Sequence, residues 1–272
     1  MSRRLDAAFA AARAENRAAL IVFLEAGDPS LAATQRLVRA VAEAGADIVE
    51  LGVPFSDPIA DGPVIQRASE RALVKGTSLA GVLDLAARLR KDGLTTPLVL
   101  FSYANPLLAM GEAVFAETAR RAGIDGVLVT DLPPEEGRLF VSVLRAARLA
   151  PIFLVAPSSP EPRLRKAASQ SRGFLYAVSR AGVTGARAEM SEGLPEFLAR
   201  VKASAGDLPV AVGFGISTAE QVAGAAKLAD GVVVGSAVVR VIEEAVARGE
   251  DPVPHVTALV SELRRATVLK QT

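Results

Sequence analysis

The chain has 272 residues, of which 50% are hydrophobic, and a formal net charge of +1 from 31 basic and 30 acidic residues. That length suits one large α/β barrel or two small domains, and the balanced charge gives no support to a nucleic-acid or membrane-surface partner, which would need a concentrated positive field. With no cysteine and the single histidine His255, disulfides, thiolate metal sites and cysteine nucleophiles are excluded, and histidine-based metal sites or triads nearly so. Acid–base chemistry then falls to carboxylates, tyrosine or lysine.

The first part of the chain, residues 1–20, is rich in arginine and alanine, as a transit peptide would be. Asp6 and Glu15 argue against that interpretation, and Leu5 with Phe9 has the spacing of an amphipathic helix. The longest apolar run, 231–239, is too short to span a bilayer. We therefore expect an extra N-terminal helix and a soluble, cytoplasmic protein without a membrane partner.

Short apolar runs typical of strands then alternate with amphipathic helical runs along the whole chain. Eight strands are predicted, at 20–24, 47–52, 97–103, 126–130, 151–155, 173–178, 209–213 and 231–235. Most of these runs are apolar throughout, as expected of parallel strands that are covered on both faces. The pattern predicts an α/β fold, a single (β/α)8 TIM barrel over residues 1–272, in preference to a doubly wound open sheet, which usually has fewer strands.

The last two predicted strands are followed by glycine-rich turns. The sequence GFGIS occupies residues 213–217, and Gly235 and Ser236 follow the eighth strand. Glycines let backbone N–H groups approach an anion, and Ser217 or Ser236 could open a helix whose positive end faces it. Ser217 with Glu220 also has the spacing of a capping box. Either turn alone could be ordinary, but both at these two positions favour a phosphate site.

The stretch IVELGVPFSDPIADGP, residues 48–63, places a carboxylate at the end of an apolar strand and two more on the stiff loop after it. Glu50 has apolar neighbours, and partial desolvation would raise its pKa toward the range of a general acid–base group. The alternative is a carboxylate paired with an arginine at the barrel rim. Asp61 could instead cap the following helix, and Asp57 could form a turn.

The remaining strand ends carry weaker signals. Tyr103 and Tyr176 are the only tyrosines and both lie at strand ends, whereas Asp131 has the features of a loop or cap residue. The loop 179–187, SRAGVTGAR, could be a lid that excludes water or a flexible surface loop. Since no lysine ends a strand, an imine-forming aldolase is disfavoured. A phosphorylated substrate handled by carboxylates, without metal or imine, is what remains.

Together these motifs resemble the tryptophan synthase α chain family, in order and over nearly the whole sequence. The matching stretches are ELGVPFSDPIADGPVIQRAS, AGDP, YANP, GVLVTDLPPEE, SRAGVTG and VGFGIS. The resemblance implies a lyase of tryptophan biosynthesis that cleaves indole-3-glycerol phosphate to indole and glyceraldehyde 3-phosphate by a retro-aldol reaction. It also implies an α2β2 complex with a β chain that carries pyridoxal phosphate and consumes the indole through a tunnel, while this chain needs no cofactor or metal.

The resemblance also assigns roles to individual residues. It implies Glu50 as the general acid–base group and Asp61 as the partner of the indole nitrogen. The implied substrate site comprises Phe23, Phe101, Tyr103, Leu128, Leu154, Tyr176 and Thr184. The implied phosphate site comprises Gly185, Gly213, Phe214, Gly215, Gly235 and Ser236, and the implied partner surface Pro54, Asp57, Asn105 and Pro133.

One residue departs from the family pattern. Glu25 precedes AGDP, where the family typically has an uncharged residue such as threonine. Its charge could raise the pKa of Glu50 by repulsion, or it could pair with an arginine such as Arg180. Three alternatives stay open: a free-standing lyase that needs no β chain, a non-catalytic α-like regulatory subunit, and another phosphate-binding barrel such as an isomerase of the same pathway.

Overall fold

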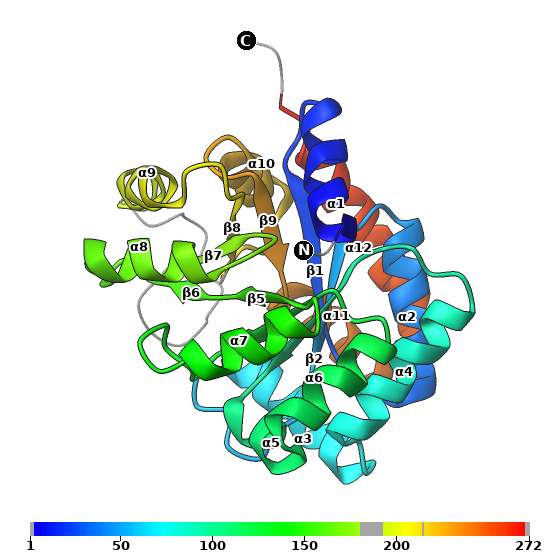
Figure 1. Ribbon diagram of the computed structural model, residues 1–272. Coiled ribbons are helices and arrows are strands. Elements are labelled where there is room, and N and C mark those ends of the chain that lie inside the picture. The colour runs from blue at the N-terminus through cyan, green and yellow to red at the C-terminus, as the bar shows by residue number, and fades with distance from the viewer. Residues whose placement is uncertain (1–2, 180–192, 214, 270–272) are drawn as a thin grey trace.

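The computed structural model describes residues 3–179, 193–213 and 215–269, in which parallel strands form one sheet that curls into a barrel (Figure 1). Along the sheet the strands follow the order β5-β4-β3-β2-β1-β9-β8-β7-β6. Their bounds are β1 (Ala19–Glu25), β2 (Ile48–Gly52), β3 (Leu98–Ser102), β4 (Gly126–Val129), β5 (Ala150–Ile152), β6 (Leu154–Val155), β7 (Leu175–Val178), β8 (Val210–Gly213) and β9 (Gly231–Val234).

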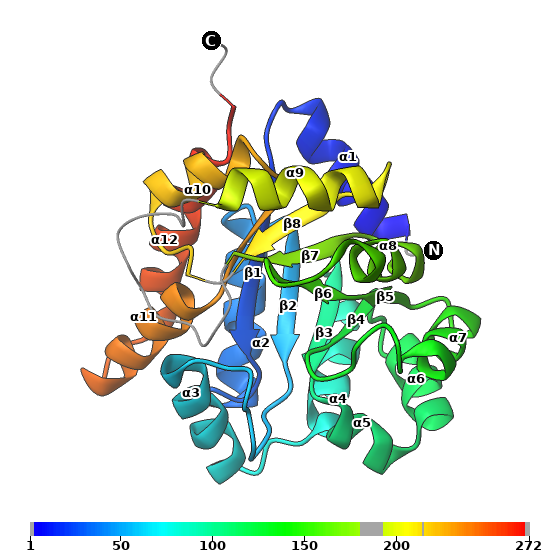
Figure 2. The ribbon, with the colours of Figure 1, turned by 90° about the vertical axis from the view of Figure 1, so that its left-hand side faces the viewer.

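Helices follow the strands and cover the outside of the sheet (Figure 2). They are α1 (Arg3–Ala14), α2 (Leu31–Glu43), α3 (Pro63–Val74), α4 (Leu79–Lys91), α5 (Ala104–Met110), α6 (Glu112–Arg121), α7 (Arg138–Ala146), α8 (Glu161–Gln170), α9 (Leu194–Ala205), α10 (Ala219–Ala226), α11 (Ser236–Ala247) and α12 (Pro252–Ala266). In the part of the chain that the structure describes, none of them combines the length and apolar character needed to cross a bilayer.

The predicted (β/α)8 barrel is confirmed, with its fifth strand split in two. Phe153 separates β5, which pairs with β4, from β6, which pairs with β7. The backbone N–H of Phe153 donates to the hydroxyl of Ser171 at 3.2 Å instead of to a neighbouring strand. The two short strands therefore occupy one strand position of the barrel.

The strands are apolar on both faces because each face has its own core. In β1, Leu20 and Val22 face the helices and belong to the outer hydrophobic cluster. Ile21 and Phe23 belong to the inner cluster, which fills the barrel. This arrangement explains why the strand sequences are continuously apolar rather than alternating.

Helix α1 closes the N-terminal end of the barrel, as an extra helix before the first strand. Its Leu5 and Phe9 pack against glycines at strand starts, and a Cβ atom added at Gly173 or Gly231 would lie 2.9 Å or 3.1 Å from those side chains. Figures 1 and 2 place α1 at the end of the barrel opposite to α3. The other end, where the strands terminate, is left to the βα loops.

Candidate active site

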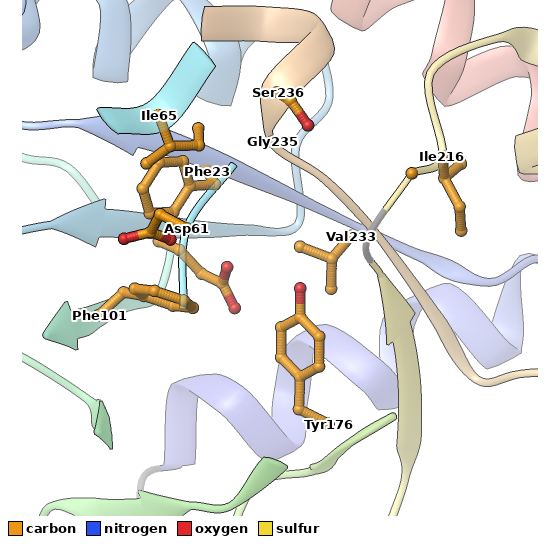
Figure 3. Close-up of a pocket in the computed structure, with 11 residues that line it drawn as sticks. Phe23, Asp61, Ile65, Phe101, Tyr176, Ile216, Val233, Gly235 and Ser236 are labelled. Atoms are coloured by element: carbon orange, nitrogen blue, oxygen red, sulfur yellow. The ribbon is translucent and has the colours of Figure 1, made fainter. Parts of the chain in front are cut away.

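A pocket lies at the C-terminal ends of the strands, where barrel enzymes place their chemistry. It spans about 440 Å³ of space not filled by protein atoms, part of which is open to solvent. Its lining comprises Phe23, Glu50, Asp61, Ile65, Phe101, Tyr176, Gly215, Ile216, Val233, Gly235 and Ser236. In Figure 3, Asp61, Phe23 and Phe101 lie on one side of the pocket, Ile216 lies on the other, and the Tyr176 hydroxyl points into the space between them.

Glu50 is fully buried inside the barrel. It lies on β2 in register with Phe23 of β1 and Val99 of β3, so its side chain is surrounded by strand residues. Among the described residues neither carboxyl oxygen has a hydrogen-bond partner. Burial raises the pKa of Glu50 to about 8. An arginine-paired carboxylate at the rim is therefore the wrong interpretation, and Glu50 can hold a proton at neutral pH and deliver it.

Asp61 is the second carboxylate of the pocket and has a different environment. The hydroxyl of Tyr103 donates to its Oδ2 at 2.8 Å, and that hydroxyl accepts from the backbone N–H of Ala60 at 3.0 Å. Burial raises the pKa of Asp61 to about 6, while the hydrogen bond from Tyr103 acts in the opposite direction. At neutral pH Asp61 is mainly charged and Glu50 mainly neutral, although both are buried.

Asp61 is not the cap of the following helix. The residue at the N-cap of α3 is Gly62, which provides no side-chain hydrogen bond, and Pro63 begins the helix. The backbone oxygen of Asp61 accepts from the side chain of Gln66 at 2.9 Å, which fixes the chain while the carboxylate points into the pocket.

Aromatic side chains form the walls near the two carboxyl groups. The rings of Phe23 and Phe101 meet edge to face, with their centroids 5.2 Å apart. Tyr176 is buried, and its hydroxyl lies so close to Gly213 that a Cβ atom at that position would collide with it. The position of Tyr176 therefore requires a glycine at 213. From the sequence, this glycine was expected only to let backbone N–H groups approach an anion.

Three residues of the implied substrate site are not part of the pocket lining. Leu128 lies below it, in the inner hydrophobic cluster, and Leu154 packs against that cluster. Tyr103 acts through its hydrogen bond to Asp61. Conversely, the pocket includes Ile65, Val233 and Ile216, which sequence reasoning missed, because an apolar residue carries no chemical signal of its own.

The helix N-terminus at Ser236 is suited to an anion. No described side chain caps α11, whose N-cap is Gly235, and Gly235 and Ser236 both line the pocket. By contrast, α10 has a capping box formed by Thr218 and Gln221, and the Ser217–Glu220 box predicted from the sequence is wrong. The first turn of α11, which has no described side-chain cap, therefore begins at the pocket, and a helix N-terminus of this kind can bind phosphate.

Several predicted site residues lie outside the described residues. They are Thr184, Gly185 and Phe214, together with Arg180 and the rest of the loop up to 187. Of the other phosphate residues, Gly215, Gly235 and Ser236 line the pocket, and Gly213 ends β8 beside it. The described residues hold no group of three or more His, Cys, Asp or Glu side chains that could bind a metal ion.

Glu25 occupies a different environment from the one expected. It is 4% exposed at the end of β1, where the Ser69 hydroxyl donates to its Oε1 at 3.3 Å. Burial raises the pKa of Glu25 well above its usual value, and the charge of Asp61 raises it further. The pKa of Glu50 is raised by burial, so the expected repulsion between Glu25 and Glu50 is replaced by one between Glu25 and Asp61.

The residues of the implied partner surface follow the C-terminal ends of β2, β3 and β4. Asp57 and Asn105 are exposed, Pro133 is half-buried, and Pro54 is buried and offers no free surface in the isolated chain. The carboxylate of Asp131 accepts from the backbone N–H of Ala104 at 2.7 Å, which ties the start of α5, where Asn105 lies, to the loop that carries Pro133.

Comparisons with known proteins agree on one family. The family model for the tryptophan synthase alpha chain matches residues 9–268. A tryptophan synthase alpha chain from Methylococcus capsulatus is 49% identical over 264 residues, which is 97% of this chain and 98% of that protein. One from Geobacter sulfurreducens is also 49% identical, over 265 residues, again covering 97% of this chain and 98% of that protein.

Solved structures give the same result. A chain of Mycobacterium tuberculosis tryptophan synthase superposes with a TM-score of 0.89 and 41% identity, covering 99% of this chain and 100% of that one. The tryptophan synthase alpha chain from Legionella pneumophila superposes with a TM-score of 0.88 and 36% identity, covering 97% of both chains.

Proposed function

This chain belongs to the tryptophan synthase alpha chain family, a family of lyases that cleave indole-3-glycerol phosphate to indole and glyceraldehyde 3-phosphate, and we propose that the pocket described above carries out that cleavage with Glu50 and Asp61. The observation that carries the proposal is the pair of buried carboxyl groups with different pKa values, one at about 8 and one at about 6, in a pocket that ends at an uncapped helix. In such a pair, the carboxyl group with the higher pKa can act as the proton donor, and the one with the lower pKa can act as the anion.

Glu50 transfers the protons. The bond between indole C3 and the first glycerol carbon breaks only after C3 has been protonated, because indole is otherwise a poor leaving group. The protonated carboxyl of Glu50, with no described hydrogen-bond partner to hold its proton, donates to C3. The resulting carboxylate, directly or through water, then takes the proton of the glycerol hydroxyl as the aldehyde forms and the carbon–carbon bond breaks.

Asp61 stabilises the charge that develops. Protonation at C3 moves positive charge onto the ring nitrogen, and an ionised carboxylate next to that nitrogen lowers the energy of the intermediate. Tyr103 keeps Asp61 in its charged form and in place through the 2.8 Å hydrogen bond. Phe23 and Phe101 provide apolar walls suited to the flat indole ring.

The phosphate of the substrate binds at the other end of the pocket. Gly235 and Ser236 begin α11, and the partial positive charge of that helix end favours an anion. The roles implied for Thr184, Gly185 and Phe214 fit the same site and form part of the proposal, although they lie outside the described residues. With the phosphate bound there, the indole extends toward Glu50 and Asp61.

The partner of this family is a tryptophan synthase beta chain, which carries the pyridoxal phosphate, while the alpha chain works without a cofactor. We place the beta-chain contacts at Asp57, Asn105 and Pro133, and the arrangement as α2β2, with no role for nucleic acid or a membrane. The chain would work as one domain, residues 1–272, in the cytoplasm.

The decisive experiment is an assay of indole release from indole-3-glycerol phosphate by the purified chain, with and without a tryptophan synthase beta chain. Slow release that rises sharply with the beta chain is expected of an alpha subunit. Fast release by the chain alone would identify a self-sufficient lyase. Substrate binding without release in both cases would contradict the proposal and favour a regulatory subunit.

A further inference from the structure

Glu25 is a buried carboxyl group that the proposed mechanism does not use. It is the last residue of β1 and is 4% exposed. No ion pair of Glu25 occurs among the described residues, and Arg71 of α3 is bound by Asp28 at 2.8 Å and by Glu243 at 2.7 Å. A buried carboxylate without a cation is costly, which favours the protonated form of Glu25.

Glu25 contacts the chain on both sides of Asp61, at the end of β2 and in α3. On the first side, a Cβ atom added to Gly52 would collide with Oε2 of Glu25, so the carboxyl group rests on the last residue of β2. On the other side, Ser69 of α3 donates to Oε1 at 3.3 Å. Between these two contacts lies the segment 53–61, and the Ser69 hydroxyl also accepts from the backbone N–H of Phe55 within that segment, at 2.9 Å. Glu25 therefore contacts the chain on both sides of Asp61 and can hold it in place.

The charges around Glu25 keep it neutral. The groups that face it are Asp61 on the segment 53–61, Ser69 on α3 and Asp28 on the turn after β1; burial and the charges of Asp61 and Asp28 all raise the pKa of Glu25, against a smaller opposite effect of Ser69. Asp61 has the stronger stabilisation of its anion, a 2.8 Å hydrogen bond from Tyr103. Of two neighbouring buried carboxyl groups only one ionises readily, and here it is Asp61.

We propose that Glu25 is a positioning residue for Asp61: its carboxyl group contacts the chain before Asp61 at Gly52 and after it at Ser69, and stays uncharged, so that the negative charge of the pair resides on Asp61. This inference rests on the proposed function and names a further residue on which that function depends. It predicts that the shape and neutrality of residue 25 matter, and that its ability to ionise does not.

The kinetic test compares Glu25→Ala with Glu25→Gln, in the chain saturated with a beta chain. Glu25→Ala should lower kcat for indole release about tenfold or more with little change in KM, because Asp61 loses its fixed position while the phosphate end is untouched. Glu25→Gln keeps the shape and neutrality, so it should restore most of that kcat and leave the acidic limb of the pH profile in place. Ser69→Ala should lower kcat less than Glu25→Ala does.

A matched control separates positioning from a general loss of stability. Ser78→Ala removes a serine that caps α4 through a hydrogen bond from Gly81 and contacts neither Glu25 nor Asp61 through a described hydrogen bond. It should lower the free energy of unfolding in urea and leave kcat and the pH profile unchanged. Wild-type kcat in Glu25→Ala, or a downward shift of the acidic limb by about half a pH unit or more in Glu25→Gln, would overturn the proposal.

A second measurement does not depend on catalysis. Carboxyl-carbon NMR titration of the purified chain, with the signals assigned through Glu25→Gln and Asp61→Asn, should show Asp61 ionising at a lower pH than Glu25. The reverse order would overturn the inference even if indole release is normal. If the wild-type chain released no indole, the proposed function would fail, and the order of titration would still decide the state of Glu25.

Discussion

The carboxyl groups at the two ends of the barrel differ in how often they are paired with arginine. At the N-terminal end, Asp47 precedes β2 and binds Arg17 through two hydrogen bonds of 2.6 Å and 2.7 Å. Asp125 precedes β4 and accepts from Arg90 at 2.7 Å and from Arg4 at 3.1 Å. Each carboxylate also accepts from a backbone N–H group. All of these oxygens therefore contribute to holding strands and helices together.

At the C-terminal end, Asp28 is likewise paired with an arginine, Arg71, but three other buried carboxyl groups have no cation among the described residues. Glu50 has no hydrogen-bond partner there, Asp61 has a tyrosine and Glu25 has a serine. Burial raises the pKa of all three groups. The difference teaches that the same residue type stabilises the fold where it is paired and remains reactive where it is left unpaired, as expected for the stable and the catalytic face of a barrel.

The largest expected effect comes from removing the proton donor of the catalytic end. Glu50→Gln keeps the shape but cannot transfer a proton, so turnover should fall by about 10³- to 10⁴-fold, as is typical for the loss of a general acid–base group. Indole release measures turnover, and equilibrium binding of a non-cleavable indole alkyl phosphate measures affinity, which should change little. Retention of turnover would refute the assignment of Glu50.

The same variant should change how stability depends on pH. Because the pKa of Glu50 is about 8 in the folded chain and 4.5 is its ordinary value, its contribution to stability is complete below about 4.5 and is lost as the pH rises to about 8. Relative to Glu50→Gln, the wild type should lose about 4 to 5 kcal/mol of unfolding free energy over that range. Urea unfolding of both chains at several pH values tests this, and parallel curves would contradict it.

At the N-terminal end a substitution should affect stability instead of activity. Asp125→Ala leaves Arg90, which is 12% exposed, without its carboxylate, and should cost about 3 kcal/mol of unfolding free energy. The kcat of the folded protein should stay at the wild-type value. Glu135→Ala, which breaks an exposed ion pair with Arg163, is the matched control and should change little. A tenfold fall in kcat for Asp125→Ala would weaken the division between the two ends.

The smallest effect is a shift in the pH profile. Turnover should rise as Asp61 ionises near pH 6 and fall as Glu50 loses its proton near pH 8. The hydrogen bond from Tyr103 lowers the pKa of Asp61, so Tyr103→Phe should move the acidic limb upward by about one pH unit and leave the alkaline limb in place. An unmoved acidic limb would mean that a group other than Asp61 controls it.

Much of the fold could be predicted from the sequence because buried parallel strands have a simple signal. The apolar runs predicted all the strand positions. Of the glycines after the last two strands, Gly215 and Gly235 line the pocket, and their role in anion binding stays a prediction. The break at Phe153 could not be predicted, since it depends on a hydrogen bond to Ser171 at the far end of α8, 18 positions along the chain. The cap of α10 was assigned one residue too early for a different reason: Ser217 and Thr218 are neighbours with similar side chains, and only the geometry decides which of them caps the helix.

The site was less predictable than the fold. Glu50 could be recognised by its place at the end of an apolar strand, but its lack of a partner could not. Tyr103 reaches Asp61 across 42 positions of sequence, and Glu25 reaches Ser69 across 44. Such pairs have no local pattern, so the sequence suggested the wrong neighbour for Glu25 and a helix cap for Asp61.

The packing of α1 against the barrel has a consequence for the order of events during synthesis. Phe9 packs on Gly231 of β9, β1 pairs with β9, and Arg17 forms an antiparallel bridge with Val268. β1 can pair with β2 early, but its other edge finds β9 only when the late elements of the chain have emerged. Until then that edge of β1 has no partner strand, which makes the nascent half-barrel prone to aggregation and gives chaperones a natural point of action.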